Sequence, residues 1–335
     1  MTERILLAHG DGGVLSHQLI TGVFHKYLGN NQLNQLNDAA IVKSEHGSLA
    51  ITTDSFVVKP VFFPGGNIGK LAVVGTVNDL AVVGAVPKYL TAGFIIEEGM
   101  LISQLEEIVK TMAATAHEAG VQVIAGDTKV VERGSADLVY INTTGIGFVP
   151  EGRNLAYSRI EAGNVIIING SIGDHGLTIM SQRAGLEFIT SLKSDCAPLN
   201  MQIEVLLQEF GDDIKFMRDP TRGGVATTIK EIATASGYDM LLAEDNLPIN
   251  EVVAGMADML GLDPLYLANE GKFLMIANKI AAKKIVEKIN KFPGCSKAAI
   301  IGDVKTGKGN VFLKTAFGGT KILDLLVGEP LPRIC

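Results

Sequence analysis

Apolar and polar positions fall into short runs along the chain, and these runs predict strands and helices in mixed order. The apolar run 68–83 predicts a helix that carries Asn78 and Asp79 inside it. Four apolar side chains share one face of 103–119, which is typical of an amphipathic helix, and Gly120 is expected to end it. Strands are expected at 5–8, 48–53, 88–96, 121–125 and 137–149.

The second half continues in the same style after a linker at 150–153. Thr221 is expected to cap a helix that ends at Ser236, with Gly237 as its stop. Other helices are expected after 173–175 and at 201–210, 250–260 and 281–291, and strands at 164–168, 240–243, 272–277 and 298–302. Mixed elements with several hairpin-like connections indicate an α+β fold rather than a doubly wound parallel sheet.

Length and charge narrow the class of protein. The 335 residues are enough for two ordinary domains. A net charge of −7 argues against a general nucleic-acid or anionic-membrane surface, and we expect neither partner. We find no run of 18 apolar residues, no signal peptide and too few cysteines for a disulfide framework, so we expect a soluble, cytoplasmic protein.

The chain ends on a cysteine, Cys335, shortly after Pro330 and Pro332. Each proline fixes its φ and biases the residue before it toward extended geometry, so the end is expected to form a stiff, extended arm. From Gly328 the arm could reach roughly 23 Å, enough to carry a thiol into a neighbouring cleft. The alternative is an ordinary frayed terminus.

Three aspartates in the first half lie within or directly after apolar elements: Asp54, Asp79 and Asp127. Burial of a carboxylate without a partner is costly. Carboxylates that converge from several elements are typical of Mg²⁺ sites, where substrate phosphates complete the octahedron. Each aspartate taken singly is better explained as a cap or a turn residue. Together, beside glycine-rich loops, they favour a metal–nucleotide site.

Two glycine-rich stretches could approach phosphates. The loop 9–13 could place its backbone N–H groups against a triphosphate, although it is not a P-loop and could be a simple turn. Gly223 and Gly224 begin a predicted helix. Either an anion site or close packing of the helix could explain the two glycines. Lys129 and Glu270 are candidates for acid–base or electrostatic roles, or are ordinary ion-pair residues.

The remaining two cysteines and the histidines show no such pattern. Cys196 lies in a polar segment and Cys295 between Gly294 and Ser296, with no histidine or metal-ligand spacing around either. We interpret both as structural. The six histidines show no zinc-type spacing.

Several of these stretches together resemble the HypE family of hydrogenase maturation proteins, within the PurM-like (AIR synthetase-like) ATP-binding superfamily. The acidic and glycine-rich motifs are typical of the superfamily, whereas the end Pro332-Arg333-Ile334-Cys335 singles out HypE. The matching segments are 9–13, 53–55, 77–81, 125–130, 218–226 and 332–335.

The resemblance implies a two-domain α+β protein that binds ATP and Mg²⁺ in a cleft. It implies a PurM-like ATP-binding domain at 1–150 that forms a homodimer, a C-terminal domain at 154–326 and a flexible tail at 327–335. The carbamoyltransferase HypF would load Cys335, and the chain would dehydrate the carbamoyl group to a thiocyanate with ATP. The cyanide would pass to iron held by HypC and HypD, for the active site of [NiFe]-hydrogenase.

The resemblance also implies roles for single residues. Lys129 would be an electrostatic stabiliser and Glu270 the proton acceptor for the dehydration of the group on Cys335. The metal ligands would be Asp54, Asp79 and Asp127. The other nucleotide-binding residues would be Gly10, Asp11, Gly12, Gly13, Asn78, Gly223 and Gly224.

Two alternatives remain at this point. Another PurM-like enzyme, such as a selenophosphate synthetase or a thiamine-phosphate kinase, would not need the terminal cysteine. A non-catalytic carrier would ferry a group on Cys335 and would not depend on Lys129 or Glu270 for chemistry on the thiol.

Overall fold

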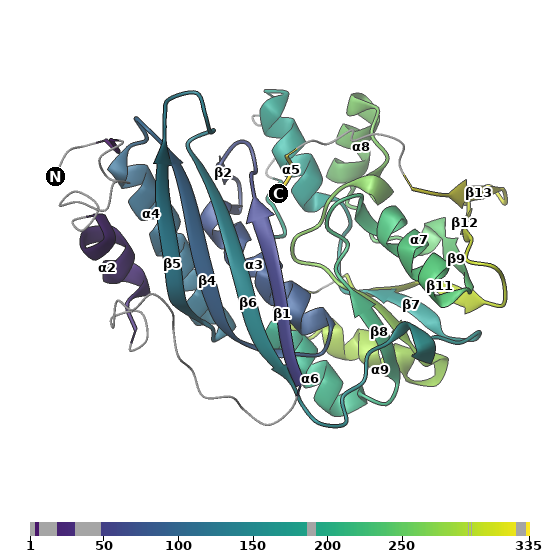
Figure 1. The fold of residues 1–335 in the computed structure, drawn as a ribbon. Helices are drawn as coiled ribbons and strands as arrows, with labels where there is room; N and C mark the ends of the chain where they lie inside the picture. The colour runs from purple at the N-terminus through teal and green to yellow at the C-terminus, as the bar shows by residue number, and fades with distance from the viewer. Residues whose placement is uncertain are drawn as a thin grey trace. The chain divides into compact units, whose positions relative to one another are not determined.

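The computed structural model describes residues 4–6, 19–30, 48–185, 192–293, 295, 297–325 and 333–335 (Figure 1). The described residues divide into two compact units. The first draws on Met1–Leu80, Ala85–Glu151 and Cys335, and the second on Ala81–Gly84 and Gly152–Ile334. No helix in the described part is long and apolar enough to cross a membrane.

The first unit is built on a four-stranded sheet in the order β1-β6-β4-β5. Its strands are β1 (Ser48–Phe56), β4 (Val86–Glu97), β5 (Gln122–Val131) and β6 (Val139–Val149). β6 pairs antiparallel with β1 and β4, and β4 pairs parallel with β5. The other elements are a π-helical turn η2 (Ile20–Phe24), α2 (His25–Leu28), α3 (Ile68–Val82), α4 (Ile102–Ala119) and the short strands β2 (Phe62–Phe63) and β3 (Gly66–Asn67).

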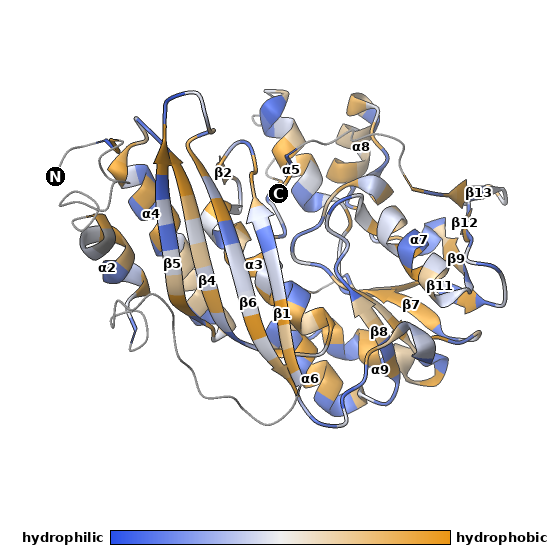
Figure 2. Ribbon diagram, in the orientation of Figure 1, coloured by the Kyte–Doolittle hydropathy of each residue, from blue (hydrophilic) through white to orange (hydrophobic). Residues whose placement is uncertain are grey.

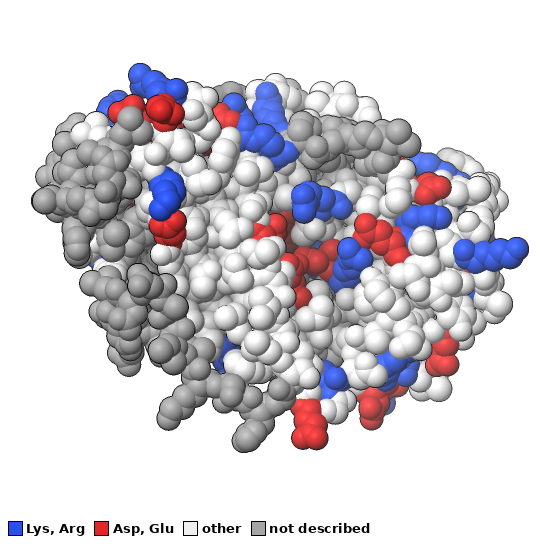
Figure 3. Space-filling model, viewed as in Figure 1, with Lys and Arg blue, Asp and Glu red and all other residues white. Residues whose placement is uncertain are grey.

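Helix α3 covers one face of this sheet. Thr143 on β6 donates its hydroxyl to the carbonyl of Ala72, 2.9 Å away, and shares a hydrogen bond with Thr76. At Gly69 an added Cβ would lie 2.3 Å from the Ile108 carbonyl oxygen, so α3 and α4 pack very closely there. The opposite face of the sheet is turned toward the viewer in Figure 1, and Figure 3 shows few charged side chains on it.

The second unit is built on a seven-stranded sheet in the order β13-β12-β9-β11-β7-β10-β8. All its pairings are antiparallel except that of β12 with β9. Its strands are β7 (Val165–Ile168), β8 (Ile214–Arg218), β9 (Asp239–Ala243), β10 (Leu274–Ala277), β11 (Ala299–Lys305), β12 (Val311–Lys314) and β13 (Thr320–Leu323).

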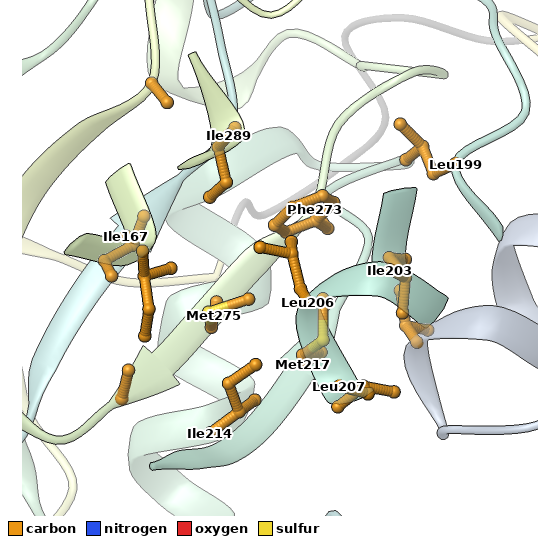
Figure 4. Packing of buried hydrophobic residues seen from close by; sticks show 14 of the residues in the cluster. Ile167, Leu199, Ile203, Leu206, Leu207, Ile214, Met217, Phe273, Met275 and Ile289 are labelled. Atoms are coloured by element: carbon orange, nitrogen blue, oxygen red, sulfur yellow. The ribbon is translucent and has the colours of Figure 1, made fainter. Parts of the chain in front are cut away.

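Helices cover both faces of this second sheet. Along β7, Val165 and Ile167 belong to one buried cluster, and Ile166 and Ile168 to another. Alternate side chains of a strand point to opposite faces, so β7 is buried on both sides, and Figure 2 colours it hydrophobic throughout. Figure 4 shows the first cluster, with Phe273 and Leu206 at its centre. The helices are α5 (Asp174–Arg183), α6 (Asn200–Phe210), α7 (Gly224–Ser236), α8 (Glu251–Leu260) and α9 (Lys279–Ile289), with short 3-10 turns η4 (Tyr157–Arg159), η6 (Glu244–Asn246) and η7 (Pro264–Tyr266).

The α+β prediction is confirmed, and the long helices lie within two residues of their expected bounds. Four local predictions are wrong. Ile5 and Leu6 are not in a strand, and the rest of the strand expected at 5–8 lies outside the described residues. The strand expected to end before Asp54 continues to Phe56. The strand expected at 121–125 continues to Val131, because its second half pairs with β4. Gly223, with φ of 74°, takes the cap position expected of Thr221. Strands β8, β12 and β13 were not expected.

Candidate active site

Asp54 and Asp79 lie close together in the first unit, where β1 packs on α3. The hydroxyl of Thr52 on β1 donates to a carboxylate oxygen of Asp79 at 2.9 Å. Asp54, two residues further on β1, points to the same face as Thr52, and an added Cβ on Gly75 would lie 3.6 Å from its Oδ2. Because Gly75 and Asp79 are one helical turn apart, the two carboxylates face the same contact between strand and helix.

Asp127 lies on the other face of the same sheet. The register runs from Ser55 through Asn142 and Gly93 to Asp127, so these residues share one face. Asp54 is one residue out of that row and therefore points to the opposite face. Three strand spacings, about 14 Å, also separate β1 from β5. Within one chain, Asp54 and Asp79 therefore lie together, whereas Asp127 lies away from both of them.

The oxygen donors of the Asp54–Asp79 pair fit a magnesium ion. Mg²⁺ commonly takes one or two carboxylates and completes its shell with water and substrate phosphates. Within the described ranges no group of three or more His, Cys, Asp or Glu side chains could hold a metal, so an all-protein cage is not formed there. Asn78, next to Asp79 on α3, is 1% exposed.

Lys129 pairs with Asp127, two residues before it on β5. The Nζ of Lys129 lies 2.9 Å from Asp127 Oδ2, and both side chains are more than half exposed. The hydrogen bond from Lys129 holds the pKa of Asp127 below its ordinary value. Both residues belong to the open face of β5, where their charges are accessible.

Glu270 belongs to the second unit, in the loop before β10, and is 3% exposed. Its backbone N–H donates to Asp195 Oδ1 at 3.1 Å. Asp195 in turn forms a 2.9 Å ion pair with Lys272, and both of these side chains are less than a tenth exposed. The expected partner of Glu270, Lys129, lies in the other unit, so their pairing stays a prediction.

Gly223 and Gly224 are the cap and first residue of α7, and both have positive φ. An added Cβ on Gly224 would lie 2.6 Å from the carbonyl oxygens of Leu265 and Leu267. Close packing of the helix start against η7 is therefore a sufficient reason for glycine at 224. An anion site there stays a prediction, and the loop with Gly10, Asp11, Gly12 and Gly13 lies outside the described residues.

The last three residues are held in place by their backbone carbonyls. Arg183 donates to the carbonyl of Arg333, and the carbonyl of Ile334 lies 2.9 Å from Nε2 of His175. The carbonyl oxygen of Cys335 accepts a 3.1 Å hydrogen bond from the N–H of Val57. The Ile334 side chain is 3% exposed and Cys335 is half-buried. This end of the chain is not frayed.

Sequence reasoning missed the residues that surround this end of the chain. His175 and Ile334 are 159 positions apart, and Lys272 and Asp195 are 77 apart. No short motif links positions so far apart. The one available signal was the charged Lys272 directly before the wholly apolar run 273–277, where an unpaired charge would be costly.

The comparisons with known proteins agree with the motif analysis. Models of AIR synthase related proteins match residues 36–149 (N-terminal domain) and 161–314 (C-terminal domain). A carbamoyl dehydratase HypE from Rhizobium leguminosarum bv. viciae is 48% identical over 334 residues, which are 99% of this chain and 95% of that protein. The chain belongs to the HypE family.

Solved HypE structures share the fold along nearly the whole chain. A HypE crystallised in complex with ATP superposes with a TM-score of 0.95 at 47% identity, covering 98% of this chain and 99% of that one. HypE from a HypE–HypF complex superposes with a TM-score of 0.80 at 46% identity, covering 92% and 99%. The PurM-like fold expected from the sequence is thereby confirmed.

Proposed function

We propose that this chain is an ATP-dependent carbamoyl dehydratase that acts on its own C-terminal thiol. It converts an S-carbamoyl group on Cys335 into a thiocyanate, which supplies the cyanide ligands of the [NiFe]-hydrogenase iron. Full-length membership of the HypE family supports this activity. The structural observation that carries it is the anchored end of the chain, which holds the residues next to Cys335 by their carbonyls.

Cys335 is the most suitable of the three thiols for this role. Cys196 is 2% exposed, and burial raises the pKa of the Cys295 thiol, so neither suits a nucleophile that must meet another protein. Cys335 is half-buried and ends the chain. A carbamoyltransferase, HypF, would load it, as a solved HypE–HypF complex of a relative suggests.

The dehydration needs a leaving group and two proton transfers. ATP supplies the phosphoryl group with which the amide oxygen departs, and Mg²⁺ supplies positive charge beside the phosphates. Asp54 and Asp79 would hold the metal, with Asn78, Gly223, Gly224 and the loop at Gly10–Gly13 around the nucleotide. The carbamoyl nitrogen loses both its protons, which leaves the carbon–nitrogen triple bond of the thiocyanate.

Lys129 and Glu270 are proposed as the electrostatic stabiliser and the proton acceptor. Glu270 is 3% exposed, so it can accept a proton from the carbamoyl nitrogen at a place that is shielded from bulk water. Lys129 is held by Asp127 on the open sheet face, where its ammonium stays accessible to negative charge. These roles derive from the family resemblance. Variants at both positions would test them.

A homodimer through the open face of the first sheet is part of the proposal. Leu49, Ile51 and Ile95 lie on that face with exposed side chains, and a second copy could bury them. Asp127 lies on the same face, so any metal shell that includes it would draw it from the second copy. HypC and HypD would receive the cyanide, and the reaction would take place in the cytoplasm.

Replacement of the terminal thiol tests this function. Cys335→Ala is expected to form no thiocyanate with HypF, carbamoyl phosphate and Mg-ATP, while it binds ATP as the wild type does. Cys295→Ala serves as a matched control and should retain thiocyanate formation. Thiocyanate from Cys335→Ala at the wild-type level would overturn the proposal and would favour another PurM-like activity.

A further inference from the structure

His175 binds the peptide carbonyl directly before Cys335. It lies near the start of α5, is 0% exposed, and its Nε2 is 2.9 Å from the Ile334 oxygen. A carbonyl oxygen only accepts hydrogen bonds, so Nε2 carries the proton. Nδ1 lies 2.7 Å from the hydroxyl of Ser194 and is left to accept from it. The tautomer follows from its partners.

The surroundings of His175 hold the ring in this orientation. The Ser194 hydroxyl also accepts a 3.1 Å hydrogen bond from the Cys196 N–H, which leaves its proton for Nδ1. Asp195, the next residue, is anchored by Lys272 at 2.9 Å. Burial lowers the pKa of His175 although the charge of Asp195 opposes this, so the neutral ring prevails at neutral pH. Rotation of the ring would break two hydrogen bonds.

Two further contacts complete a docking site in the second unit. Arg183, on the last turn of α5, donates to the carbonyl of Arg333. The side chain of Ile334 is apolar and is 3% exposed. Arg333 has φ of 53°, an unusual value for a residue other than glycine, which turns the backbone just before the two contacts. The site therefore recognises two consecutive carbonyls and one aliphatic side chain.

We propose that His175, assisted by Arg183, is a positioning residue that docks the chain end for dehydration and plays no part in loading. This inference rests on the proposed dehydratase function. Loading requires Cys335 to leave for another protein, whereas dehydration requires it to return to a fixed place. A few neutral or singly charged hydrogen bonds and one aliphatic side chain suit reversible docking better than permanent attachment.

Two variants at position 175 separate a donor role from a space-filling role. His175→Gln keeps an N–H donor at about the position of Nε2, whereas His175→Leu fills the space without a donor. In single-turnover reactions of preloaded protein, we expect His175→Leu to dehydrate at least about tenfold more slowly and His175→Gln to stay within about threefold of the wild type. Loading by HypF should proceed at the wild-type rate in both.

A third variant changes the tail itself and leaves the helices and strands of the second unit unaltered in sequence. Ile334→Ala shortens the docked side chain within the tail, and Leu325→Ala, at a side chain that is 51% exposed, is the matched control. Docking is followed by the rate at which Cys335 is alkylated, with peptide mapping to distinguish it from Cys196 and Cys295. Faster alkylation and slower dehydration are expected for Ile334→Ala and not for Leu325→Ala.

Several outcomes would overturn the proposal. Wild-type alkylation and dehydration in both His175→Leu and Ile334→Ala would show that the contacts do not position the thiol. An equal loss of loading and dehydration would indicate general damage instead of positioning. If the wild type itself never dehydrates, the proposed function fails, but the alkylation rates still decide whether His175 docks the tail.

Discussion

Lys272 and Asp195 form a 2.9 Å ion pair in which both side chains are almost completely buried. The pair lies beside His175 and fixes the loop before β10, because Asp195 also accepts from the backbone N–H groups of Glu270 and Gly271. Burial opposes the charge of Asp195, but the attraction of Lys272 and these hydrogen bonds outweigh it and lower its pKa. The pair therefore organises the loop that carries the proposed proton acceptor.

Removal of one partner of this pair should strongly destabilise the protein. We expect Lys272→Met to lower the free energy of unfolding by about 3–5 kcal/mol, because it leaves a buried carboxylate without its cation. Lys321→Met is the matched control, since Lys321 and Asp263 also lie 2.9 Å apart but remain partly exposed, and about 0–1 kcal/mol is expected. Equal losses in urea unfolding would contradict this account of the buried pair.

The lowered pKa of Asp195 should make the free energy of unfolding decrease at acidic pH. Its contribution is present above the ordinary value of 3.8 and is lost as the pH falls through the lower pKa of the folded state. Between pH 4 and 2 we expect the free energy of unfolding to fall less steeply in Asp195→Asn than in the wild type. The difference should not exceed about 1.4 kcal/mol per pH unit, the value for one proton. If the free energies of unfolding of the two proteins, measured by denaturant titration, fall in parallel with pH, Asp195 is not a source of the acid sensitivity.

Asp79 should be needed for the metal–nucleotide complex. Asp79→Asn can still accept the hydrogen bond from Thr52, but it removes the negative charge, so Mg-ATP affinity measured by calorimetry should fall at least about tenfold. Asp137→Asn, at a partly exposed carboxylate paired with Lys59, is the control and should bind normally. Unchanged affinity of Asp79→Asn would remove Asp79 from the metal shell.

Gly224 should be far less tolerant of a side chain than Gly237. Both have positive φ, so alanine strains the backbone at either position by about 1 kcal/mol. At Gly224 the added Cβ would also meet two carbonyl oxygens at 2.6 Å, whereas at Gly237 nothing lies within 4 Å. We expect Gly224→Ala to cost clearly more in thermal unfolding. Equal costs would mean that close packing is not the reason for glycine at 224.

The sequence predicts local structure well where one element carries its own signal. The one-sided apolar pattern of α4 and its left-handed Gly120 are visible in the residues themselves, and both are observed. Of the three aspartates expected to share a metal site, Asp54 and Asp79 face the same contact between β1 and α3. Periodicity did not show that 126–131 continue as a strand, because pairing with β4 decides this. Once those residues are in a strand, register sends Asp127 to the open face.

The docking of the tail could not be predicted from the residues. The stretch 328–335 indicated an extended arm, of which 328–332 lie outside the described residues. The contact of Ile334 with His175 joins two segments 159 positions apart. Neither residue has an unusual local context. Only the folded second unit brings the two together and supplies Ser194 and Asp195 around them.

Mass spectrometry of the C-terminal peptide tests the dehydratase account most directly. The protein would be loaded with HypF and carbamoyl phosphate and then incubated with or without Mg-ATP. The account predicts that Cys335 gains one carbamoyl group and then loses the mass of one water only when Mg-ATP is present. A carbamoyl group that forms on Cys335 and persists unchanged in Mg-ATP would contradict it and would make the chain a carrier.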